Sequence, residues 1–230
     1  MKTILLILVL STFSFASIAQ IDDLKDAADK GRELFNSNSL NIGQIKTKVA
    51  EFGANTVTEL AIDNAFSADP SIYIPLPKQY EYVKTTVVRF GGESLVKRVE
   101  MQLNEAAEKT IDAAKPILTN AIQQLTLQDA LSIAPKSNGF SNYLEGKSFN
   151  QIEILLRPLV KQVLDKAGTY NLLNDLFKQY KRFAGFFGKS IPNGPDLDQY
   201  VAEKATAGLF LKLGERESKF RSEKLPAIFN

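Results

Sequence analysis

Apolar residues recur every three or four positions along most of the chain, which is the spacing of amphipathic α-helices. No pair of alternating apolar and polar runs is joined by a hairpin turn, so we expect no sheet. We therefore predict an all-α fold, a single irregular multi-helix bundle. The predicted helices cover roughly residues 43–66, 78–90, 95–125 with a kink or restart near Pro116, 148–167, 172–183 and 197–220.

Two helix starts carry local signals. Ser148 followed by Gln151 has the spacing of a capping box, in which each side chain bonds the other residue's backbone N–H. Thr126 followed by Asp129 resembles the start of a short helix that reaches Ala134. We expect helices to begin at both places.

The stretch SIYIPLPKQY, residues 71–80, interrupts this helical pattern. Pro75 and Pro77 lack a backbone N–H, and each biases the residue before it toward extended geometry. We predict an extended, proline-containing strap near 71–78 that crosses the helices as an internal tie. A docking site for a partner's groove is the alternative. The side chains that the strap would bury are Ile72, Ile74 and Leu76.

The first residues have the pattern of a secretory signal peptide. Lys2 precedes a continuous apolar run, and small residues follow near Ala19, with Ala16 as an alternative cleavage position. No later stretch is long and apolar enough to span a membrane. We expect a periplasmic or otherwise exported protein that is soluble, and not transmembrane, after cleavage. The predicted organisation is a signal peptide at 1–19, an N-terminal helix and polar linker at 20–42, and an all-helical domain at 43–230.

Composition narrows the possible chemistry. The chain contains no cysteine, no histidine and no tryptophan. Disulfides, the usual zinc sites and Ser–His or Cys–His nucleophiles are therefore excluded. The 28 basic residues nearly balance the 26 acidic ones, which argues against a nucleic-acid partner. We expect no metal, no cofactor and no catalytic set.

Six segments occur in a fixed order: YIPLP at 73–77, LNEAAEK at 103–109, AKPIL at 114–118, LTLQDA at 125–130, RPLVK at 157–161 and DQYVAEKATAGLFLKLGERESKFR at 198–221. Together they resemble an exported bacterial family known as Domain of Unknown Function family 4197. The resemblance implies a signal-bearing helical protein of the bacterial envelope. It brings no established activity and no catalytic residues.

Two groups of residues are candidates for a function. Glu105, Glu108 and Asp112 follow one stripe of a predicted helix and could bind a cation or exchange protons, although a solvated face explains them as well. The segment 179–189 interleaves aromatic and basic residues and could lie on a membrane or bind a ligand, although core packing explains it too. Its candidate contacts are Tyr180, Lys181, Arg182, Phe183, Phe186 and Phe187.

We therefore expect a non-enzymatic helical protein of the cell envelope that binds a protein partner or an apolar ligand such as lipid. A carboxylate-dependent hydrolase of the envelope is the alternative, because adjacent helical turns can bring two acids to a useful separation.

Overall fold

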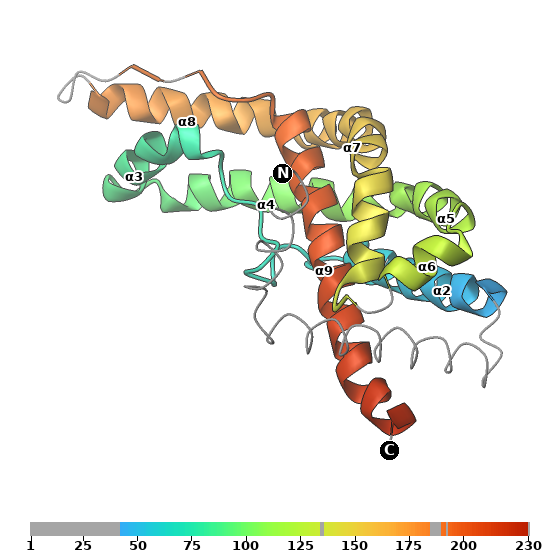
Figure 1. Cartoon of the computed structure of the whole chain (residues 1–230). Helices are drawn as coiled ribbons and strands as arrows, with labels where there is room; N and C mark the ends of the chain where they lie inside the picture. The colour runs from blue at the N-terminus through green and yellow to red at the C-terminus, as the bar shows by residue number, and fades with distance from the viewer. Residues whose placement is uncertain (1–41, 134–135, 185–189, 192, 230) are drawn as a thin grey trace, which may run out of the picture. The chain divides into compact units, whose positions relative to one another are not determined.

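The computed structural model describes residues 42–133, 136–184, 190–191 and 193–229 (Figure 1). The predicted signal peptide, its cleavage site and the helix expected within 20–42 lie outside these ranges. Over the described ranges the secondary structure consists of α-helices and 3-10 turns without a strand. The predicted all-α class is confirmed.

The described helices follow one another closely along the chain. Their bounds are α2 Ile42–Leu60, η1 Lys78–Tyr80, α3 Glu81–Arg89, α4 Glu93–Thr110, η2 Ile111–Ala114, α5 Lys115–Gln123, α6 Leu127–Ile133, α7 Gly139–Ala167, α8 Thr169–Ala184 and α9 Leu197–Phe229. The residues from Lys46 to Asn230 form one compact unit. Within it, α9 packs along α7, while α4 contacts α7, α8 and α9 (Figure 1).

Several boundaries follow the sequence pattern. The helix expected to kink near Pro116 ends at Thr110, passes through η2 and restarts as α5. Pro116 lies in the first turn of α5, where its missing N–H has no intrahelical acceptor to lose. A helix starts at Thr126 and Asp129 as predicted, and the two residues cap it reciprocally. The Asp129 N–H donates to Thr126 Oγ1 at 3.1 Å, and the Thr126 N–H donates to the Asp129 carboxylate at 3.0 Å.

The helix predicted over residues 43–66 is too long. α2 ends at Leu60 rather than near residue 66, and Asn64 adopts a left-handed conformation with φ of 66°. Asparagine tolerates this conformation better than most residues, and a left-handed residue cannot continue a right-handed helix. Phe66 nevertheless lies in the core, on the turn that leads to the strap.

The capping box predicted at Ser148 is wrong. α7 begins at Gly139, and Ser148 lies inside it with Oγ donating to the Leu144 carbonyl at 2.6 Å. The actual cap comes from another helix. Glu217 of α9 accepts hydrogen bonds from the backbone N–H groups of Phe140 at 3.1 Å and Ser141 at 2.8 Å. A cap supplied across the fold replaces the local signal.

The predicted strap lies inside the fold and is free of helix over residues 73–77, while residues 71–72 belong to a turn and Lys78 begins η1. Ile72, Ile74 and Leu76 are all buried in the hydrophobic core. Pro75 and Pro77 exclude helix, so the backbone N–H and carbonyl groups of the strap need partners other than helical ones. The side chains that supply these partners come from α4 and α9.

Candidate functional site

A buried polar stripe runs along α4 where the strap crosses it. Glu100, Asn104 and Glu108 follow one another at intervals of four residues and therefore share one face of the helix. All three side chains are buried. Buried polar groups of this kind must be paired to be tolerated. The hydrogen-bond partners of these side chains show what the stripe does within the fold.

Asn104 pairs with the strap as a neighbouring β-strand would. Its Oδ1 accepts the Ile74 N–H at 2.9 Å, and its Nδ2 donates to the Ile74 carbonyl at 2.9 Å. The same Nδ2 also donates to the Glu100 carbonyl at 2.7 Å. The side chain of Asn104 therefore satisfies both the backbone N–H and the backbone carbonyl of Ile74.

Glu100 binds the next part of the strap. Its Oε1 accepts the Leu76 N–H at 3.0 Å and the Lys84 ammonium at 2.7 Å. Its Oε2 accepts the Tyr73 hydroxyl at 2.8 Å. Burial and this carboxylate together raise the pKa of Tyr73 well above its ordinary value, so Tyr73 stays a hydrogen-bond donor. Lys84 balances the charge of Glu100.

Glu108 serves the turn before the strap. Its Oε1 accepts the N–H of Phe66 at 2.9 Å and that of Ser67 at 3.3 Å. The three polar residues of the α4 stripe thus fix the backbone at four points between residues 66 and 76.

α9 contacts the same segment. The Tyr200 hydroxyl donates to the Pro75 carbonyl at 3.1 Å, and Lys212 pairs with Asp69. Gly208 allows close approach, because a Cβ there would stand 3.0 Å from the Phe66 ring and 3.3 Å from Ile72. The strap therefore ties α4 to α9.

The three candidate carboxylates have different surroundings. Glu105 pairs with Lys109, and Asp112 pairs with Lys115, both on the helix surface. Glu108 alone is buried, and it is hydrogen-bonded to the backbone. Sequence reasoning missed Glu100 and Asn104, although their spacing of four from Glu108 was a signal that could have found them. Over the described ranges, no group of three or more acidic residues is arranged to hold a metal ion.

The aromatic and basic candidates lie on α8. Tyr180 is buried, with its ring 5.9 Å edge-on from Tyr82, and Phe183 is stacked on Phe90 with the centroids 4.3 Å apart. Lys181 and Arg182 are exposed. The remaining two candidates, Phe186 and Phe187, lie outside the described residues.

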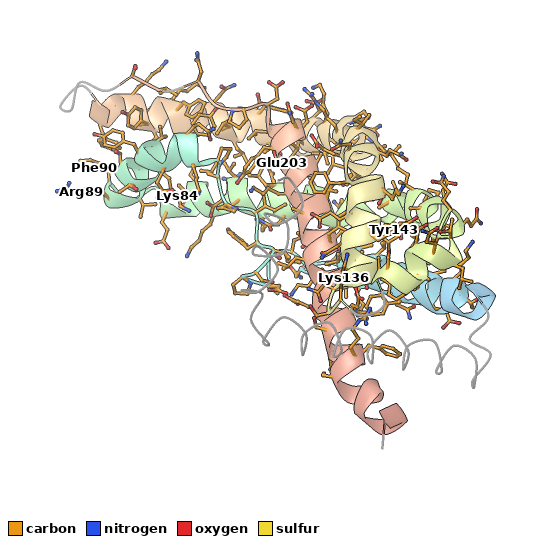
Figure 2. The ribbon with its side chains drawn as sticks, viewed as in Figure 1. Lys84, Arg89, Phe90, Lys136, Tyr143 and Glu203 are labelled. Atoms are coloured by element: carbon orange, nitrogen blue, oxygen red, sulfur yellow. The ribbon has the colours of Figure 1, made fainter. Side chains whose placement is uncertain are left out.

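Ring pairs show that α3 and α8 run in parallel. Tyr80 contacts Phe177 near the start of α3, and Phe90 contacts Phe183 at its end. The carboxyl ends of the two helices therefore lie side by side, and Figure 2 shows Arg89 and Phe90 at this end. We call this surface the α3/α8 tip. It consists of Val88, Arg89, Phe90, Lys181, Arg182 and Phe183.

The tip exposes apolar surface as well as charge. Val88 is 37% exposed and Phe90 is 42% exposed. Neither residue was a candidate contact from the sequence, because Val88 lies in α3 and Phe90 directly follows it, far along the chain from the aromatic and basic segment on α8.

Polar contacts connect the two long helices, α7 and α9. Arg157 of α7 donates to Asp198 at 2.9 Å and to Asp196 at 3.0 Å, at the start of α9. These bonds raise the pKa of Arg157, with the hydrogen bond to Asp198 as the main cause. Near the other end of the contact between α7 and α9, Arg221 pairs with the Glu217 cap at 2.6 Å.

A family model described as a protein of unknown function, DUF4197, matches residues 43–227. The chain belongs to this family. The DUF4197 match spans the strap, the α4 stripe and most of α9. No curated protein and no solved structure matches the chain. Among the helices that the structure describes, none is both long and apolar enough to cross a membrane.

Proposed function

We propose that this DUF4197 protein is a non-enzymatic, exported helical protein of the bacterial cell envelope that binds a protein partner or an apolar ligand. The observation that carries the proposal is the use of the buried carboxylates. Glu100 and Glu108 accept hydrogen bonds from the strap and its preceding turn, and Glu217 caps α7. Acids committed to backbone N–H groups are poorly suited to proton transfer, since a reacting group needs access to substrate.

The segments that resemble the family support the same reading. YIPLP forms the strap, LNEAAEK contributes Asn104 and Glu108, and the last segment contributes Tyr200 and Gly208. Each of these four residues contacts the strap or the turn that precedes it. Binding is then a property of the outer surface, where the α3/α8 tip combines exposed apolar and cationic side chains.

The signal peptide pattern supports export, since Lys2, the apolar run and the small residues before position 20 are typical of secreted precursors. Fractionation of cells that express the full chain tests this part. We expect the processed protein in the periplasmic or envelope fraction. Unprocessed protein in the cytoplasm would refute export.

Native mass spectrometry of protein purified from its own envelope tests binding. We expect additional mass that corresponds to a lipid or to a partner protein. Bare monomer alone, together with the absence of any cross-linked partner in cells, would contradict the binding proposal. Turnover of envelope glycan by the purified protein, abolished by Glu108→Gln without loss of the fold, would contradict the non-enzymatic part and favour the hydrolase.

A further inference from the structure

We propose that the α3/α8 tip docks on an anionic membrane surface. The inference rests on the proposed binding function and names the partner as a lipid bilayer with acidic headgroups. It is carried by the juxtaposition of three exposed cations and two exposed apolar side chains on helices that end side by side. The cations are Arg89, Lys181 and Arg182, and the apolar side chains are Val88 and Phe90.

The charge at the tip is positive and locally unbalanced. Within the described residues, no ion pair involves Arg89, Lys181 or Arg182, whereas the nearby Glu93 and Lys97 at the start of α4 neutralise each other at 2.7 Å. Two helix carboxyl ends contribute about −0.5 charge each, so three cations leave about +2. The whole chain carries a formal net charge of +2, so the residues other than these three cations sum to −1.

The apolar part of the tip is small. Phe90 is stacked on Phe183 and remains 42% exposed, next to Val88. Aromatic and aliphatic side chains flanked by cations suit the boundary between headgroups and acyl chains. Two partly exposed side chains offer far less area than the about 800 Å² per partner of a standard protein interface.

Vesicle co-sedimentation tests the charge requirement with two matched variants that each remove three positive charges. The tip variant combines Arg89→Gln, Lys181→Gln and Arg182→Gln. The control variant changes three exposed lysines away from the tip, namely Lys136→Gln, Lys147→Gln and Lys166→Gln. Lys166 precedes the start of α8, and Lys181 of the tip lies about 18 Å beyond that start along the helix.

We expect wild-type protein to bind vesicles that contain phosphatidylglycerol and not vesicles of phosphatidylcholine alone. The tip variant should lose about 100-fold in affinity, since each cation near an anionic surface contributes roughly fivefold. The control should lose less than about fivefold. Equal losses in the two variants would overturn the proposal, because they would indicate a general charge effect.

A tryptophan reporter tests the apolar contact without removing a cation. The chain contains no tryptophan, so Phe90→Trp provides a single fluorophore at the tip, and Ile154→Trp provides a matched exposed control on α7. We expect a blue shift on anionic vesicles for Phe90→Trp only. The absence of binding to anionic vesicles would overturn the tip proposal, while a partner or lipid mass in native spectra would still support the proposed function.

Discussion

Replacement of Asn104 by leucine is expected to destabilise the protein strongly. Asn104 is fully buried and satisfies both the N–H and the carbonyl of Ile74, which is also fully buried. Leucine has the same number and branching of side-chain heavy atoms, so the change removes hydrogen bonds without creating a cavity. Leaving a buried polar group without a partner costs about 1–3 kcal/mol. Two such groups, offset in part by added apolar burial, give a loss of about 3 kcal/mol.

Urea unfolding followed by circular dichroism measures this change. A loss of about 3 kcal/mol lowers the folding equilibrium constant roughly 150-fold. The matched control is Asn150→Leu at an exposed position of α7, where we expect a change within about 0.5 kcal/mol. If Asn104→Leu unfolded at the same urea concentration as wild type and with the same slope, the tie between α4 and the strap would not contribute to stability.

Three further predictions concern other contacts of the tie and of α9. Gly208→Leu should cost about 1–3 kcal/mol in urea unfolding, because its side chain would overlap Ile72; unchanged stability would refute this close packing. Glu217→Gln should cost about 2 kcal/mol and speed amide exchange in the first turn of α7, because the charged cap is lost; unchanged exchange there would contradict the cap. Asp69→Asn should remove a pH-dependent contribution to the free energy of unfolding. Pairing with Lys212 lowers the pKa of Asp69 from 3.8 to about 2, so this stability is present above pH 3.8 and disappears as the pH falls toward 2. The side chain is 34% exposed, and screening reduces the expected difference from wild type to about 1 kcal/mol near neutral pH; a difference that persists at pH 2 would refute it.

The helices and the strap could be predicted because the patterns that determine them lie in neighbouring residues of the sequence. Apolar spacing placed Val99 and Leu103 on a buried face of α4, and proline chemistry excluded helix around Pro75. The start of α7 could not be predicted, because its cap comes from Glu217, which is 76 residues from Ser141 along the chain. The local signal at Ser148 therefore predicted a helix start that the structure does not have, because the distant carboxylate of Glu217 caps the helix at its earlier start.

The candidate site was harder to predict for a related reason. Acidic residues lie on both the inner and the outer side of α4, so spacing alone grouped Glu108 with the surface residues Glu105 and Asp112. Only tertiary contacts distinguish them, because the strap supplies a backbone donor to Glu100 and the turn before it supplies backbone donors to Glu108. The α3/α8 tip likewise depends on a contact between helices, which no single segment of sequence contains.

Amide hydrogen exchange at Ile74 and Leu76 tests the central claim most directly. These two N–H groups belong to neither a helix nor a sheet, and their acceptors are the side chains of Asn104 and Glu100. We predict that both amides exchange as slowly as the core amides of α4, and that Asn104→Leu speeds exchange at Ile74. Rapid exchange at both positions in the wild-type protein would contradict the account of the strap as an internal tie.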